Sequence, residues 1–267
     1  MLNGLDLFSG YGGITVGLRD WVRPVAYCEI EKYAQSILLS RMAEGEITRA
    51  PIWDDIRTFN GTALRGSVDI IYGGFPCQDI SIAGAGRGLG GERSSLFFEV
   101  CRLVKEIKPS FIFLENVPAI RTRGLLEVAQ SLTDLRYDCR WTRVSAREVG
   151  APHLRQRWFL LAHANSKRLE GRDSKVLSEC SGEWASGKSG TQAAHNGDNA
   201  DGQRFQAKKQ SLQKRTDAEP IRASWWGVEP DVGRVAYGIA HRVDRIKALG
   251  NGVVPQQVKE AFIKLIG

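Results

Sequence analysis

The chain has 267 residues, 42% of them hydrophobic, and carries a net charge of +7 with a pI of about 9.3. This length and composition allow the core of one large domain, or of one domain with a small module. The basic balance is compatible with a polyanionic partner, although many basic proteins bind no nucleic acid.

Cysteine usage and hydropathy exclude several protein classes. The 5 cysteines are odd in number and widely spread, which argues against a disulfide framework and for a reducing compartment. No CxxC pair or His/Cys cluster has the spacing of metal ligands, so we expect no metal. The first twenty residues do not resemble a signal peptide, and no apolar run approaches the ~20 residues of a membrane span. We therefore expect a cytoplasmic protein.

The first predicted strand, residues 4–8, runs into the glycine-rich turn 9–14 and then into a helix that reaches Trp21. Strand, glycine turn and helix together suit a nucleotide-type cofactor, because glycines allow a close approach and the helix start offers free N–H groups. The spacing is GxGG rather than the GxGxxG of dinucleotide-binding proteins. An ordinary strand-to-helix turn would use glycine as well.

A second predicted strand, residues 25–28, ends at Glu29. A carboxylate at this place can accept both hydroxyl protons of a ribose. The alternatives are a cap on the predicted helix 30–43 or a solvated surface acid.

The predicted strand 68–73 is followed by Gly-Phe-Pro-Cys-Gln, which places Cys77 just beyond a strand end. Ligands bind at such ends in open α/β sheets, so Cys77 is a candidate nucleophile. The alternative is a small buried hydrophobic residue, the usual role of a free cysteine. The glycine-rich stretch 78–95 suits a loop that moves over a substrate.

Two further strand ends carry charged residues. A buried-type strand at 111–114 follows the predicted helix 95–107 and ends at Glu115, and the apolar run 158–162 is preceded by Arg155 and Arg157. A thiol, a carboxylate and two guanidinium groups at strand ends form one potential constellation. For the arginines, a structural salt bridge is the alternative.

The remaining elements complete the fold-class prediction. A helix at about 122–133 and a strand near 136–144 continue the alternation, which predicts an α/β fold with a doubly wound, mostly parallel sheet. Residues 163–222 contain too few large apolar residues for a core of their own, so a disordered insertion is one interpretation. The chain closes with a Gly-Asn-Gly turn at 250–252 and a last helix ending near Leu265.

The tripeptides PCQ, ENV and RQR, in this order, resemble the cytosine-C5 DNA methyltransferase family. The resemblance covers residues 4–162 and 241–262. It implies the S-adenosylmethionine-dependent methyltransferase fold, S-adenosyl-L-methionine as methyl donor, and double-stranded DNA with a flipped-out cytosine as substrate.

The resemblance also assigns roles. Cys77 would attack cytosine C6, Glu115 would act as an acid near N3, Arg157 would donate to O2, and Arg155 would orient the carboxylate. Asp55 is preferred to Asp54 for the adenine amino group because an isoleucine follows it. The full set of implied cofactor-binding residues is Phe8, Gly10, Gly13, Glu29, Asp55, Pro76, Leu96, Asn251 and Val253.

The same resemblance implies an organisation: residues 1–162 for catalysis and cofactor binding, a short target-recognition region at 163–232, and a segment 233–267 that returns to the first domain. It implies a monomeric bacterial or phage-encoded enzyme of a restriction–modification system. Methylation of transfer RNA and a catalytically silent nucleic-acid-binding module remain as alternatives. His153 and Gly252 depart from the family pattern, which usually has Gln and Ser there.

Overall fold

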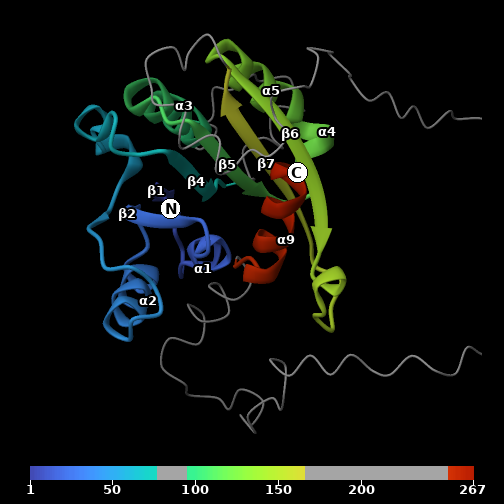
Figure 1. Cartoon of the computed structure of the whole chain (residues 1–267), viewed down its shortest axis with the longest axis horizontal. Helices are drawn as coiled ribbons and strands as arrows, with labels where there is room; N and C mark the ends of the chain where they lie inside the picture. Colours follow the sequence, from blue (N-terminus) through green and yellow to red (C-terminus); the bar gives the residue numbers. More distant parts are fainter. Residues whose placement is uncertain (77–94, 166–251) are drawn as a thin grey trace, which may run out of the picture. The chain divides into compact units, whose positions relative to one another are not determined.

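A computed structural model describes residues 1–76, 95–165 and 252–267, which all lie in one compact unit (Figure 1). The predictions for Cys77, Asn251 and the insertion 163–232 fall wholly or mostly outside these residues. The strands are β1 (Leu2–Leu7), β2 (Val22–Cys28), β3 (Ile52–Trp53), β4 (Ile70–Gly74), β5 (Phe111–Asn116), β6 (Tyr137–Ser145) and β7 (Gln156–Ala164). The α-helices are α1 (Gly13–Leu18), α2 (Lys32–Ala43), α3 (Ser95–Ile107), α4 (Ile120–Arg123), α5 (Leu125–Asp134) and α9 (Pro255–Ile266).

The described strands form one sheet of seven in the order β3-β2-β1-β4-β5-β7-β6. Strands β1 to β5 run parallel, and β7 is antiparallel to both of its neighbours, β5 and β6. The predicted α/β class with a mostly parallel, doubly wound sheet is therefore confirmed. The reversed direction of β7 was not predicted, because an apolar run carries no information about strand direction.

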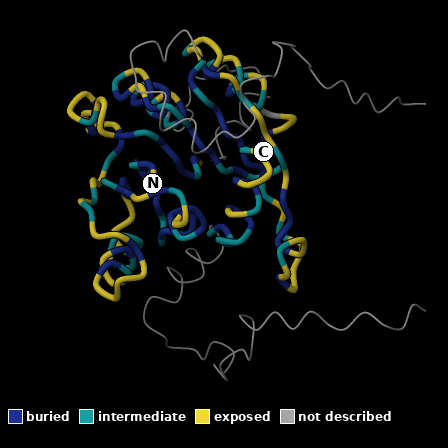
Figure 2. Tube along the Cα trace, viewed as in Figure 1, coloured by how far each residue is buried: buried dark blue, intermediate teal, exposed yellow. Residues whose placement is uncertain are grey.

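Alternate strand residues face the two helical layers. Leu5, Ile71 and Ile112 belong to the core cluster that also contains residues of α3 and α5. On the opposite face the ring of Phe113 contacts Phe262 of α9, with centroids 5.4 Å apart. Figure 2 shows buried residues along the strands and exposed residues on the outer turns.

Helices α1 and α9 pack closely because α1 presents a glycine to its neighbour. A Cβ at Gly17 would lie 2.5 Å from Val258 Cβ and 2.6 Å from the carbonyl oxygen of Pro255. Any larger residue would force the helices apart. This contact joins α9, the last helix, to α1, which follows β1.

The predicted elements agree with the structure to within a few residues. The helix expected at 95–107 is α3, whereas the helix expected between the turn 9–14 and Trp21 is α1, which begins at Gly13 and ends at Leu18. The two-residue strand β3 and the 3-10 helices Ile56–Thr58, Gly61–Leu64 and Arg147–Val149 were not predicted. Among the described residues no helix is long and apolar enough to cross a membrane.

Candidate active site

The turn after β1 forms one wall of a pocket at the carboxyl edge of the sheet. Phe8 and Gly10 both have φ of 54°, a left-handed conformation that is costly for phenylalanine and easy for glycine. Glu29, at the end of β2, holds this turn. Its Oε2 accepts the backbone N–H of Gly10 at 2.7 Å, and its Oε1 accepts that of Glu31 at 2.8 Å.

The pocket has a volume of about 230 Å³. Of the residues predicted to bind a cofactor, Phe8, Gly10, Gly13, Glu29 and Val253 line it. The lining also includes Glu115 and residues that sequence reasoning did not assign: Ser9, Tyr11, Ile14, Glu31, Tyr33, Ala34, Gly74 and Gly252. A glycine-rich turn with a carboxylate at the end of the next strand fits an adenosine-type group.

A carboxyl group lies at the end of β5, beside the end of β4. Glu115 is paired in register with Gly74, and a Cβ at Gly74 would lie 2.6 Å from Glu115 Oε2. Glycine at 74 therefore makes room for the carboxyl group. Burial raises the pKa of Glu115 to about 7, against the opposing effect of the guanidinium groups of Arg157 and Arg155.

Arg157 reaches Glu115 because β7 runs antiparallel to β5. The start of β7 lies at the same sheet edge as the end of β5, with Asn116 paired to Trp158. Arg157 Nε lies 2.7 Å from Glu115 Oε1, and both side chains are mostly buried. In an all-parallel sheet the residues that begin this strand would lie at the opposite edge.

Arg155 connects the start of β7 to the C-terminal segment. Its Nη2 donates to the carbonyl oxygen of Gly252 at 2.5 Å. Gln257 of α9, which is fully buried, donates from Nε2 to the carbonyl oxygens of Arg155 (2.7 Å) and Val144 (2.8 Å). The backbone of Arg155 is thus fixed by a side chain that the sequence did not single out.

Asn116 fixes the chain just before the predicted nucleophile. Its Nδ2 donates to the carbonyl oxygen of Phe75 at 3.0 Å, and its Oδ1 accepts the N–H of Val117 at 2.8 Å. Pro76 is exposed, is not part of the pocket lining, and is the last described residue before Cys77. The end of β5 therefore holds the end of β4 at this edge.

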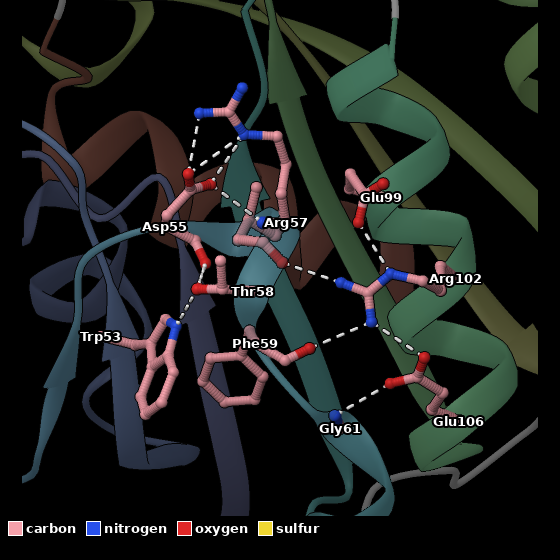
Figure 3. A network of polar contacts seen from close by, with 10 residues as sticks. Trp53, Asp55, Arg57, Thr58, Phe59, Gly61, Glu99, Arg102 and Glu106 are labelled. Atoms are coloured by element: carbon pink, nitrogen blue, oxygen red, sulfur yellow. Dashed lines mark hydrogen bonds and ion pairs between the residues drawn. The ribbon is translucent and has the colours of Figure 1, made fainter.

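The structure does not bring Asp55 into the pocket lining. Its carboxylate forms a two-pronged contact with Arg57, whose Nη2 lies 2.7 Å from Oδ2 and whose Nε lies 3.0 Å from Oδ1 (Figure 3). Its Oδ1 also accepts the backbone N–H of Arg57 at 3.0 Å. Asp54 is exposed. The contact of Asp55 with adenine stays a prediction.

The segment that carries Asp55 is held by Arg102 of α3 (Figure 3). Arg102 donates to the carbonyl oxygens of Ile56 (2.8 Å) and Phe59 (3.0 Å). On its own helix it pairs with Glu99 and Glu106 at 2.7 and 2.8 Å. Leu96, at the start of the same helix, packs half-buried against the core and does not line the pocket.

A buried carboxyl group lies beneath the turn. Asp6 on β1 is 1% exposed, and its Oδ2 accepts the hydroxyl of Thr15 at 2.6 Å. Thr15 also lies 2.8 Å from the hydroxyl of Tyr72. Burial raises the pKa of Asp6 to about 8, with a smaller raising effect from Glu29.

The described part of the chain offers no cluster of metal ligands. No group of three or more His, Cys, Asp or Glu side chains is placed there to hold a metal ion. In the same part, burial raises the pKa of the three thiols, those of Cys28, Cys101 and Cys139, to about 12. These thiols are poor sources of thiolate at neutral pH.

Comparison with known proteins gives consistent matches. A sequence profile described as C-5 cytosine-specific DNA methylase matches residues 2–248. Type II methyltransferase M.CviJI of Paramecium bursaria Chlorella virus IL3A is 37% identical over 159 residues, which cover 59% of this chain and 42% of that protein. Type II methyltransferase M.HhaI of Haemophilus parahaemolyticus is 30% identical over 174 residues, covering 62% of this chain and 50% of that protein. The chain thus spans about half the length of these relatives.

Solved structures show the same similarity. A prophage-encoded protein of Escherichia coli, described as a DNA modification methyltransferase, matches with a TM-score of 0.50 at 29% identity, covering 64% of this chain and 48% of that one. A variant of DNMT2 from Spodoptera frugiperda matches with a TM-score of 0.52 at 20% identity, covering 62% of this chain and 51% of that one. The second match is a likeness of fold alone.

Proposed function

The chain belongs to the C-5 cytosine-specific DNA methylase family, and from this premise we propose that it transfers a methyl group from S-adenosyl-L-methionine to C5 of cytosine in double-stranded DNA. The observation that carries the proposal is the convergence of Glu115, Gly74 and Arg157 at one edge of the sheet. A carboxyl group with a raised pKa and a guanidinium group lie there beside a pocket that suits an adenosine-type group.

The pocket residues present fit the cofactor. Glu29, fixed by the N–H groups of Gly10 and Glu31, would receive the ribose hydroxyls on its remaining lone pairs. Phe8, Gly10, Gly13 and Val253 would shape the pocket around it. S-adenosyl-L-methionine supplies an electrophilic methyl group when bound. Asp55, Pro76, Leu96 and Asn251 remain proposed contacts on the strength of the family resemblance.

Cys77 follows Pro76, and we assign it the nucleophilic step. The thiolate would add to C6 of the cytosine, which makes C5 electron-rich enough to form a bond to the methyl group. The bond from that methyl group to the sulfonium sulfur of the donor would break at the same time and leave S-adenosylhomocysteine. The proton on C5 then leaves, the bond from sulfur to C6 breaks, and the thiolate is restored. The residue that receives this proton is not assigned.

Glu115 and Arg157 would act on the polar edge of the base. A carboxyl group that keeps its proton near neutral pH can stabilise the charge that develops at N3 as the thiolate adds. Arg157 pairs with Glu115 through Nε and donates from Nη1 to the carbonyl oxygen of Gln156, so Nη2 would donate toward O2 of the base. Arg155 holds the C-terminal segment through the carbonyl oxygen of Gly252, and its charge favours the ionised form of Glu115, so it would also orient that carboxylate.

A cytosine inside a duplex cannot reach this pocket, so the nucleotide must leave the stack, at a cost of about a few kcal/mol. We propose residues 1–162 as the catalytic part, residues 163–232 as the region that selects the DNA sequence, and residues 233–267 as the returning segment. The relatives' names as type II methyltransferases support a role in a bacterial or phage restriction–modification system, in which the protein would act as a cytoplasmic monomer.

Trapping the covalent intermediate tests this function. In DNA that contains 5-fluorocytosine, the last elimination is blocked because fluorine does not leave as a cation. Protein, DNA and S-adenosyl-L-methionine should then give a complex that survives denaturing electrophoresis, and Cys77→Ala should abolish it. The matched controls are alanine at Cys28, Cys101 and Cys139, whose thiols have raised pKa values.

Two results would contradict the proposal. An adduct that persists in Cys77→Ala would place the nucleophile elsewhere. Methyl transfer to transfer RNA but not to duplex DNA would support the alternative substrate.

A further inference from the structure

Tyr11 occupies the space that a side chain at position 252 would need. A Cβ built at Gly252 would overlap the hydroxyl and ring of Tyr11. The requirement for glycine is one of space, and it comes from one named side chain.

The phenol of Tyr11 also holds the chain next to that glycine. Its hydroxyl donates to the carbonyl oxygen of Val253 at 3.2 Å, while Arg155 donates to the carbonyl oxygen of Gly252. Two successive carbonyls, immediately before α9, are therefore held from two sides. One holding residue follows β1 and the other precedes β7, so the C-terminal segment closes against both.

Tyr11 is itself held in place. Arg41 of α2 donates from Nη1 to the carbonyl oxygen of Tyr11 at 2.7 Å, and its guanidinium group lies 5.9 Å from the centre of the ring. On the other side a Cβ at Gly13 would lie 3.3 Å from Tyr11 Cε2. The ring thus packs against the helix start, with little room to yield to a new group at position 252.

The pair lies at the end of the pocket that faces the catalytic edge. Tyr11 and Gly252 line the same pocket as Glu115 and Gly74. Burial raises the pKa of the Tyr11 phenol, the charge of Arg155 opposes this shift, and the charge of Glu115 adds to it. Tyr11 and Gly252 therefore form the wall of the pocket at the end near Glu115.

We propose that Tyr11 and Gly252 are a matched pair that completes this wall of the cofactor pocket. Tyr11 is a positioning residue: its ring replaces a side chain at 252, and its hydroxyl fixes the backbone at Val253. The pair explains why Gly252 departs from the serine common in the family. The identity of the ligand rests on the proposed function; the coupling between the two residues does not.

A double-mutant cycle with Gly252→Ser and Tyr11→Ala tests the pair. Titration with S-adenosylhomocysteine should show that Gly252→Ser weakens binding by about 5- to 150-fold when Tyr11 is present, because overpacking costs ~1–3 kcal/mol. In the Tyr11→Ala background the same substitution should cost less than about twofold. An equal loss in both backgrounds would contradict the proposal.

Tyr11→Phe separates the ring from the hydroxyl. It keeps the ring, so Gly252→Ser should remain as costly in this background as beside tyrosine. Gly61→Ala is the matched control, because its Cβ would meet Ile107, Glu106 and Leu103 and nothing near Tyr11. Gly61→Ala should therefore lower the unfolding free energy by the same amount whether position 11 carries tyrosine or alanine.

Unfolding without ligand keeps the test independent of the proposed function. If the unaltered protein does not bind S-adenosylhomocysteine, the proposed cofactor is contradicted. The pair is then judged by the same cycle in thermal unfolding, where Gly252→Ser should lower the midpoint when Tyr11 is present and leave it unchanged in the Tyr11→Ala background. If Gly252→Ser alone does not fold but the double variant with Tyr11→Ala does, that result would also support the matched pair.

Discussion

Arg157 Nε lies 2.7 Å from Glu115 Oε1, although the two residues come from strands that run in opposite directions. The contact exists because the beginning of β7 and the end of β5 share one sheet edge. The guanidinium group favours the ionised carboxylate, whereas burial disfavours it more strongly, and the pKa of Glu115 is raised to about 7. A carboxyl group in this balance can serve as a proton donor near neutral pH.

We expect Glu115→Gln to lower kcat for methyl transfer by about 10²–10⁴-fold, the usual contribution of a positioned acid. The amide keeps the shape of the side chain, so affinity for S-adenosylhomocysteine and the unfolding midpoint should change little. Single-turnover transfer of a labelled methyl group to duplex DNA measures the effect. An unchanged rate would remove Glu115 from the chemistry.

The same group predicts the pH dependence of the reaction. Because the proposed donor is the protonated acid and its pKa is about 7, the competent fraction is nearly complete at pH 6 and falls to roughly a tenth at pH 8. We expect kcat/KM to decline on the alkaline side with this midpoint. Glu115→Gln should lose that decline, and a decline that persists in the variant would belong to another group.

Glu29 gives a prediction for cofactor binding. Glu29→Ala removes a charged acceptor and releases the N–H groups of Gly10 and Glu31. The loss of such a hydrogen bond is worth about 1.5–3 kcal/mol, or about 10- to 150-fold in affinity. Calorimetric titration with S-adenosylhomocysteine measures it. Unchanged affinity would contradict the assignment of Glu29 to the ribose.

Arg102 gives a prediction for stability. Arg102→Met leaves the carbonyls of Ile56 and Phe59 without their guanidinium donor, so we expect a loss of about 1.5–3 kcal/mol in unfolding free energy. Lys264→Met is the control. It breaks an exposed pair with Glu260 in one helix, which is worth ~0.3–0.5 kcal/mol. Similar losses in urea unfolding of both variants would contradict a special role for Arg102.

Sequence reasoning located features that depend on short stretches of chain. The positions of Glu29 and Glu115 at strand ends follow from local apolar runs, and the structure places both at one pocket. The helix 95–107 was predicted with its correct bounds because its apolar residues recur at helical spacing.

Features that depend on strand direction or on distant packing escaped prediction. The antiparallel course of β7 decides where Arg157 points, and nothing in the run 158–162 encodes it. Gln257 and Tyr11 act through carbonyl oxygens of residues more than a hundred positions away, so no local pattern marks them. Asp55 is engaged by Arg57, a contact that the motif alone did not suggest.

Asp6 predicts a pH dependence of stability. In the unfolded chain its pKa is near 3.8, and in the fold it is raised to about 8 by burial. Between these values the folded state binds a proton that the unfolded state has released, so stability falls as pH rises, by at most about 1.4 kcal/mol per unit. Below the pKa of Asp6 in the unfolded chain and above its pKa in the fold, the contribution of Asp6 to stability does not change with pH.

Asp6→Asn isolates this contribution, because other groups such as Glu115 titrate equally in both proteins. The neutral amide can still accept the hydroxyl of Thr15, so the difference in unfolding free energy should shift in favour of Asp6→Asn as pH rises from 5 to 8. Urea unfolding at four pH values measures that difference. Asp20→Asn is the control: its exposed carboxylate pairs with Lys259 and has a lowered pKa, so its difference should be constant above pH 5. A constant difference for Asp6→Asn as well would mean that the pKa of Asp6 is not raised in the fold, against the effect of its burial.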